Sequence, residues 1–99
     1  MAGMDDTPKV RHHADESRYE LLVGDEVVGF AAYVERPDGV LDFNHTVVQP
    51  VYRGRGFAER LVTEALDDVR ADDRRVWASC WYVDQFLIEH RDYADLRAD

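Results

Sequence analysis

Alternating apolar and polar residues run through the first half of the chain and predict β-strands. The first such run covers residues 19–23, and a second, richer in β-branched residues, covers residues 26–35. Gly24 and Asp25 lie between the two runs and are residues typical of tight turns. The pattern therefore predicts a β-hairpin.

A third strand is expected over residues 40–48, after a chain reversal at residues 36–39. Simple alternation gives one face of this strand four residues, namely Leu41, Phe43, His45 and Val47. Together with the hairpin, this strand completes an antiparallel meander of three strands.

Helical periodicity begins after Pro50. Apolar residues then recur at spacings of three and four, namely Ala58, Leu61, Val62, Ala65, Leu66 and Val69. This spacing predicts a helix that ends at residues 71–73 and packs one face on the sheet, while its charged opposite face is solvated. A short strand over residues 75–80 and a second amphipathic helix from Tyr82 follow. We expect one α+β domain with α/β/α layers over residues 18–97, preceded by a flexible tail over residues 1–17.

Acidic residues outnumber basic ones by 21 to 12, which gives the chain a net charge of −9. Nucleic acids and anionic membranes bind basic surfaces, so neither is an expected partner. The single cysteine, Cys80, excludes an internal disulfide, and no spacing of histidine, cysteine or carboxylate residues indicates a metal site. The first 18 residues hold no apolar run typical of a signal peptide or membrane span, so a cytoplasmic location is expected.

The segment 48–58 joins the third strand to the first helix and carries the clearest functional signal. Gly54 and Gly56 leave room for a ligand to approach closely, and the first N–H groups of a helix are free to bind an anion. Arg53 and Arg55 make this segment locally basic in an acidic protein. The pattern indicates a phosphate-binding turn, or else a tight structural turn without a ligand.

Arg53-x-x-Gly56-x-Ala58 also matches the acyl-coenzyme A signature Q/R-x-x-G-x-G/A. On this motif, placed between a sheet strand and an amphipathic helix, the chain resembles the GCN5-related N-acetyltransferase superfamily. It is similar in particular to a small single-domain branch of about a hundred residues. The residues that carry this closer likeness are His45-Thr46, Cys80 and His90-x-x-Tyr93.

The resemblance implies a minimal version of that fold: a three-stranded antiparallel meander, a coenzyme-binding helix, a fourth strand and a C-terminal helix. It implies acetyl-coenzyme A as co-substrate, without a metal, and transfer of the acetyl group to an amine of an unknown acceptor by direct attack in a ternary complex. The residues expected to contact coenzyme A are Val47, Val48, Arg53, Gly54, Arg55, Gly56, Phe57, Ala58 and Cys80. Two positions depart from the branch, since Val47 replaces a common glutamate and Trp81 a smaller residue.

Three side chains are candidates for the chemistry. An imidazole titrates near neutrality, and His45 precedes the segment 48–58, which we call the coenzyme loop. His45 is therefore the first candidate for the base, or else a core histidine. Cys80 is expected to contact the pantetheine, to protonate the leaving thiolate, to become acetylated, or simply to pack. Tyr82 is the alternative proton donor or a structural tyrosine. The resemblance further implies that the backbone N–H of Val47 or Val48 binds the thioester carbonyl.

Two other functions remain open at the level of sequence. One is a module that binds coenzyme A or an acyl form of it without turnover, and the other is a protein-interaction domain without a cofactor. The sequence allows either a monomer or a homodimer.

Overall fold

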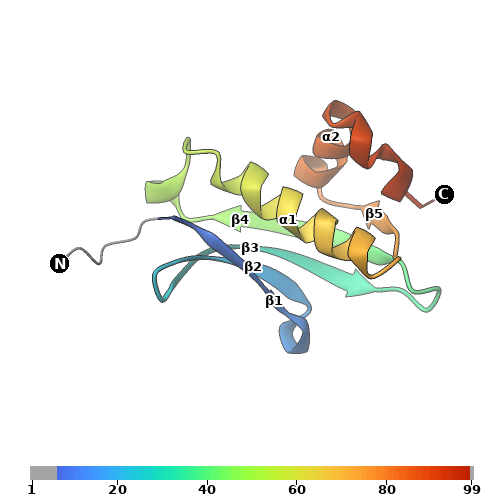
Figure 1. Ribbon diagram of the computed structural model, residues 1–99, viewed down its shortest axis with the longest axis horizontal. Helices are drawn as coiled ribbons and strands as arrows, with labels where there is room; N and C mark the ends of the chain where they lie inside the picture. The colour runs from blue at the N-terminus through green and yellow to red at the C-terminus, as the bar shows by residue number, and fades with distance from the viewer. Residues whose placement is uncertain (1–6, 99) are drawn as a thin grey trace.

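A computed structural model describes residues 7–98 and shows one mixed sheet of five strands (Figure 1). The strands lie in chain order across the sheet: β1 (Lys9–His13), β2 (Arg18–Val23), β3 (Glu26–Glu35), β4 (Leu41–Val48) and β5 (Val76–Ala78). Neighbouring strands are antiparallel from β1 to β4, and β5 is parallel to β4. The predicted hairpin and three-stranded meander correspond to β2, β3 and β4 and are confirmed.

The flexible tail predicted over residues 1–17 is wrong where the structure forms β1. Each residue from Lys9 to His13 pairs with a residue of β2, and a short 3-10 turn over Ala14–Glu16 joins the two strands. The single apolar residue of β1, Val10, packs against the core. With so little apolar signal, this strand is ordered by its ladder with β2, which alternation alone does not reveal. The part of the predicted tail before residue 7 lies outside the described residues.

Two helices complete the fold. Helix α1 (Phe57–Ala71) buries its predicted apolar face, with Leu61 and Leu66 fully covered, and α2 (Trp81–Glu89) buries Val83, Phe86 and Leu87. All of these residues belong to one core cluster with Tyr19, Leu21, Phe43 and Val76 of the sheet. The α+β class is therefore confirmed, with the coenzyme-loop helix, the short strand and the C-terminal helix in the expected order.

Both helices lie on the same face of the sheet. Glu59 in the first turn of α1 contacts His90 at the end of α2, and Arg70 of α1 pairs with Asp95 in the 3-10 segment Arg91–Leu96. An α/β/α layering would need a helix on each face, whereas the described residues leave the opposite face without one (Figure 1). We call this second surface the open face of the sheet.

The chain end closes one edge of the sheet. The Ala98 N–H donates a 2.7 Å hydrogen bond to the Val76 carbonyl, and Arg97 bridges Val76 in parallel orientation. One residue on the outer edge of β5, Val76, is thus bridged, and β1 is the edge strand on the other side.

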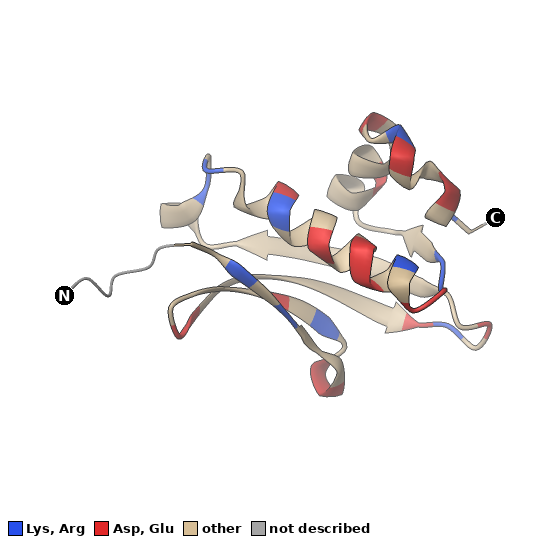
Figure 2. Ribbon diagram, in the orientation of Figure 1, with Lys and Arg blue, Asp and Glu red and all other residues tan. Residues whose placement is uncertain are grey.

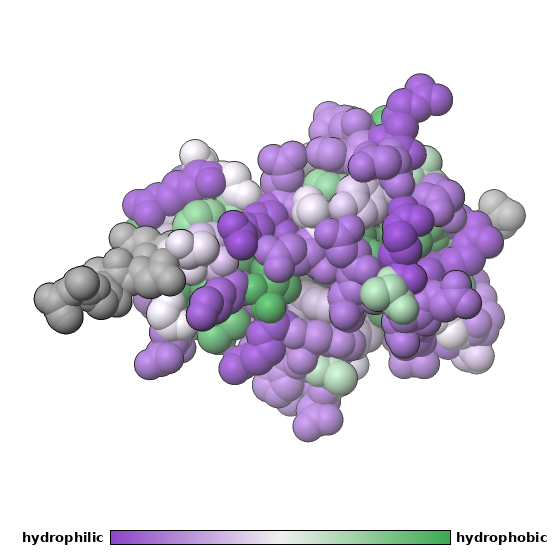
Figure 3. All heavy atoms as spheres, in the orientation of Figure 1, coloured by the Kyte–Doolittle hydropathy of each residue, from purple (hydrophilic) through white to green (hydrophobic). Residues whose placement is uncertain are grey.

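The charged residues of α1 are mainly acidic (Figure 2). The same view coloured by hydropathy is largely hydrophilic, with small apolar areas between the elements (Figure 3). Among the described residues, no helix is long and apolar enough to cross a membrane.

Candidate functional site

A β-bulge in β4 sets the geometry of the candidate site. Tyr33 pairs with Phe43, but the next residue back on β3, Ala32, pairs with His45, so Asn44 is an extra residue in the ladder. Beyond this bulge, each residue of β4 lies on the face opposite to the one that simple alternation from Phe43 predicts. His45 therefore does not share a face with Phe43, as simple alternation predicted, but lies on the open face.

The bulge also marks the point where β4 and β5 separate. The parallel ladder joins Leu41–Phe43 to Val76–Ala78, and the last backbone bond across the gap runs from the Cys80 N–H to the Phe43 carbonyl, at 2.9 Å. The Asp42 carboxylate holds Ser79 here by accepting bonds from its N–H and its hydroxyl, at 3.2 Å and 3.0 Å. Beyond this point the strands leave a cleft between them.

This cleft has a volume of about 780 Å³. Its walls come from the second half of β4, the coenzyme loop and the start of α2, and its lining residues are Asn44, His45, Thr46, Val47, Val48, Arg53, Ala58, Ser79, Cys80, Trp81 and Tyr82. The structure therefore brings all three predicted catalytic residues, His45, Cys80 and Tyr82, to one cavity.

Thr46 and Cys80 face each other across the cleft, with the thiol 3.5 Å from the threonine hydroxyl. Cys80 occupies the N-cap position of α2, two positions beyond the end of the short strand in which we had placed it. It is half-buried, as a residue in contact with a bound ligand would be. Sequence reasoning named Thr46 only as part of a motif, and the pairing with Cys80 becomes visible in three dimensions.

Tyr82 lies where three hollows meet, since it lines the cleft and two smaller hollows beside it. Burial, followed by the carboxylates of Glu59 and Glu89, raises the pKa of Tyr82 above its ordinary value. The phenol therefore stays protonated at neutral pH and can donate its proton or a hydrogen bond. His45, by contrast, is exposed, with the ring of Phe30 at 5.9 Å.

The coenzyme loop has the geometry of an anion-binding turn. Gly54 and Gly56 have φ angles of +80° and +77°, in the left-handed region that favours glycine. Helix α1 begins directly afterwards, and no described side chain caps its N-terminus. The first bond of the helix runs from Arg60 N–H to the Gly56 carbonyl, so the N–H groups of residues 57–59 have no partner within the helix.

A hollow of about 290 Å³ lies at this helix end and is continuous in its lining with the cleft, because Val48, Arg53 and Ala58 border both. The two arginines of the loop take different positions. Arg53 donates from Nε to the Val48 carbonyl at 3.1 Å and so ties the loop to β4. Arg55 lies over the ring of Tyr52, at 5.4 Å from the ring centre.

Backbone direction distinguishes the two N–H groups that were expected to bind a carbonyl. The Gln49 N–H donates to the Val28 carbonyl of β3, at 2.8 Å. Because N–H groups alternate in direction along a strand, that of Val47 points toward β3 as well, and that of Val48 points to the opposite side, where the cleft lies. Of the two, Val48 has the orientation to serve a ligand in the cleft.

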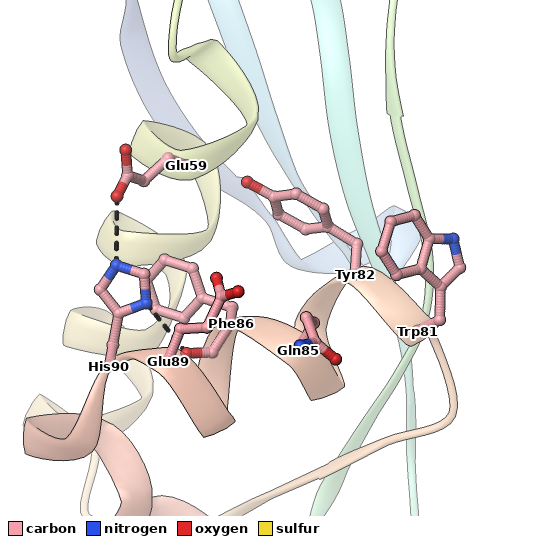
Figure 4. Close-up of a pocket in the computed structure, with 7 residues that line it drawn as sticks. All are labelled: Glu59, Trp81, Tyr82, Gln85, Phe86, Glu89 and His90. Atoms are coloured by element: carbon pink, nitrogen blue, oxygen red, sulfur yellow. Dashed lines mark hydrogen bonds and ion pairs between the residues drawn. The ribbon is translucent and has the colours of Figure 1, made fainter.

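A groove of about 320 Å³ separates the first turn of α1 from α2 (Figure 4). His90 links the two helices at one end of this groove, with Nε2 3.1 Å from the Glu59 carboxylate. Its Nδ1 lies 2.9 Å from the Phe86 carbonyl, and its ring stacks on Phe86. The backbone hydrogen bond to Phe86 and the neighbouring Glu59 raise the pKa of His90. His90 thus packs on Phe86 and lies at the C-cap of α2, and Glu59 borders the groove.

The described residues contain no group of three or more histidine, cysteine or carboxylate side chains able to hold a metal ion.

The split sheet, the helix N-terminus at one end of the split and the order of elements define an acyltransferase-type domain. A family model described as GCN5-related N-acetyl-transferase matches residues 18–96, and the chain belongs to this family. The family assignment made from the coenzyme signature is therefore confirmed.

Several curated proteins are similar to the chain over most of its length. Protein NATD1 of Mus musculus is 39% identical over 85 residues, covering 83% of this chain and 76% of the mouse protein. Protein NATD1 of Xenopus tropicalis is 30% identical over 92 residues, covering 88% and 83%. The match to Protein NATD1 of Bos taurus is 43% identical but spans 52% of this chain and 45% of the bovine protein.

A solved structure shows the same fold. The solution structure of a GCN5-like protein from Staphylococcus aureus superposes with a TM-score of 0.72 at 18% identity, and the match covers 99% of this chain and 91% of that one.

Proposed function

We propose that the protein transfers an acetyl group from acetyl-coenzyme A to an amine. The observation that carries this proposal is the continuity of the site: the free N–H groups of α1 border a hollow that shares its walls with the cleft between β4 and β5. A pyrophosphate fits the helix end, because its charge meets the unpaired N–H groups there. The pantetheine arm would then follow β4 into the cleft toward Thr46 and Cys80.

The cleft offers groups for each part of the reaction. The amine nitrogen attacks the thioester carbonyl carbon, the C–S bond breaks, and the coenzyme leaves as a thiolate that takes a proton. The Val48 N–H is oriented to bind the carbonyl oxygen as negative charge develops on it. Tyr82, with its raised pKa, is our choice for the proton donor to sulfur, with Cys80 as the alternative.

His45 is our choice for the group that accepts the proton of the amine. The described lining of the cleft contains no carboxylate, so the imidazole of His45 is the side chain there that can accept a proton. Its position on the open face places it at the mouth of the cleft rather than in the core.

The absence of a carboxylate from the described lining also favours a second candidate function, a module that binds acyl-coenzyme A without turnover. The two functions differ in one measurement, the release of free coenzyme A thiol from acetyl-coenzyme A in the presence of amines. An enzyme releases thiol at a rate that depends on the amine, and a binding module does not.

Binding itself is tested by calorimetry with acetyl-coenzyme A and coenzyme A. Gly56→Ala places a methyl group beside the helix N–H groups, and we expect the affinity to fall at least about tenfold. Gly39→Ala is the matched control, because Gly39 has a φ of +87° and, like Gly56, open space where a Cβ would stand, but lies in the turn before β4. Equal affinity of the two variants for acetyl-coenzyme A would show that the loop does not bind the coenzyme.

A further inference from the structure

The open face of the sheet is organised in rows that end at the cleft. Residues paired across adjacent strands share a face, so the ladder places His13, Arg18, Ala32 and His45 in one row. The next row contains Arg11, Glu20, Phe30 and Val47. His45 and Val47, at the β4 end of these rows, both line the cleft.

Basic side chains gather at the opposite end of the rows, on β1 and β2. Arg11 and His13 reach Glu20 on this face, and Lys9 lies on the same side of β1 because side chains alternate along a strand. Arg18 extends over the ring of Phe30, at 5.0 Å from its centre. In a chain of net charge −9, the described residues place Lys9, Arg11 and Arg18 on this corner of the open face, with the carboxylate of Glu20 among them.

Glu20 holds this basic corner in place. Its side chain is 1% exposed although no helix of the described chain covers it, because it accepts hydrogen bonds from Arg11 at 2.6 Å, Arg18 at 2.8 Å and His13 at 3.1 Å. One carboxylate cannot neutralise two arginines and Lys9, so a positive charge remains at the surface. Lys9 has no ion-pair partner among the described residues and is exposed.

Apolar side chains lie exposed at the other end of the open face. Val34 pairs in register with Asp42, and Asp42 with Trp77, so these three form a row beside the mouth of the cleft. Val34 is 54% exposed and Trp77 39%. The face thus combines exposed apolar area, an opening to the cleft and a basic corner, which together suit a polypeptide rather than a small amine.

We propose that the open face docks an acidic polypeptide whose acceptor amine enters the cleft beside His45. This inference rests on the proposed function, because it names the class of its acceptor. His13, at the basic end of its row, lies three strand spacings from His45, or about 14 Å. An extended peptide covers about 3.3 Å per residue, so acidic residues about four positions from the amine meet the basic corner.

The test uses short fluorescently labelled peptides with a single lysine, and measures their binding by anisotropy. One peptide carries glutamates about four positions from the lysine, the second glutamines there and the third arginines. At low salt we expect the acidic peptide to bind at least about tenfold more tightly than the basic one, with the difference closing at high salt because exposed charges are screened. Equal binding of the three peptides would overturn the proposal.

Two charge-reversal variants locate the surface. Lys9→Glu should weaken the binding of the acidic peptide about fivefold, since a local attraction becomes a repulsion. Arg91→Glu makes the same change of charge on the helical side, at an exposed residue without an ion pair among those described, and should change the affinity less than about twofold. Equal losses in both variants would overturn the proposal, because they would report net charge alone.

Tryptophan emission gives an independent readout. The chain has two tryptophans, and in Trp81→Phe the remaining one, Trp77, lies on the open face. Docking of the acidic peptide should shift the emission of Trp77, and an unchanged spectrum at saturation would place the peptide elsewhere. A single-stranded oligonucleotide that competes equally well would also overturn the proposal. Binding of acetyl-coenzyme A, measured separately, is unaffected by all these outcomes, so the proposed function stands or falls on its own.

Discussion

The thiol of Cys80 lies 3.5 Å from the hydroxyl of Thr46, across the gap where β4 and β5 no longer pair. Two proton donors, this thiol and the phenol of Tyr82, therefore line the same cleft. Only one of them needs to protonate a departing thiolate, and single substitutions distinguish them.

Tyr82→Phe removes the phenol proton and keeps the ring. We expect amine-dependent thiol release to fall about 100-fold, because a positioned acid contributes on that scale, while the affinity for acetyl-coenzyme A changes little. Cys80→Ala should lower the rate much less. Thiol-release kinetics with calorimetry on each variant separates the two, and a larger loss in Cys80→Ala would assign the proton donor to the thiol instead.

Deletion of Asn44 tests the bulge. Without the extra residue, β4 regains a regular ladder with β3, and its other residues keep their faces. We expect the protein to remain folded, as seen by circular dichroism, and the affinity for acetyl-coenzyme A to fall at least about tenfold because the cleft closes. Asn44→Ala keeps the chain length and should bind normally. A deletion variant that binds as tightly as the parent protein would show that the bulge does not open the site.

The two loop arginines should respond differently to salt. Arg55 contributes charge from the surface, so the loss of acetyl-coenzyme A affinity in Arg55→Ala should shrink as salt rises. Arg53 ties the loop to the Val48 carbonyl, so the loss in Arg53→Ala should persist at high salt because the loop itself is altered. Calorimetry at two salt concentrations measures both. Identical salt dependence would mean that Arg53 acts through charge alone.

Glu20 should link stability to pH. Burial opposes its ionisation, but the hydrogen bonds from Arg11, His13 and Arg18 prevail and lower the pKa of Glu20 to about 2, from 4.5. The carboxylate therefore stabilises the fold fully above about pH 4.5, and this contribution is lost as the pH falls toward 2.

Glu20→Gln should accordingly lower the free energy of unfolding by about 2 kcal/mol at pH 7, because two arginines lose their buried partner. The difference from the parent protein should narrow as the pH is lowered through this range, as measured by urea unfolding. Glu16→Gln, at an exposed carboxylate in the neighbouring turn, is the control and should have no comparable effect. A constant difference across the pH range would assign the loss to packing.

Much of the fold follows from local pattern. The hairpin, the helix over Phe57–Ala71 and the glycine turn before it each have a periodicity or a turn chemistry that the sequence displays. His45, Cys80 and the loop residues of the cleft were predicted from a motif, whereas Asn44 and Ser79 were not predicted as site residues, and nothing in their spacing showed that all of them meet.

The features that sequence did not reveal depend on partners distant in the chain. Strand β1 has one apolar residue and exists because it pairs with β2. The bulge at Asn44 interrupts an alternation that reads as regular, and it moves His45 from the predicted core face to the open one. Glu20 resembles any polar residue of a half-buried strand until its three cationic neighbours are brought together by the ladder.

The closure of β5 by the end of the chain has a consequence for assembly. Because Val76 is already bridged on the outer edge of β5, the longer free edge of the described sheet is that of β1. If two copies paired through β1, each β1 would have a partner strand on both sides, and that edge would no longer be free. Pairing through β1 therefore ends at a closed dimer.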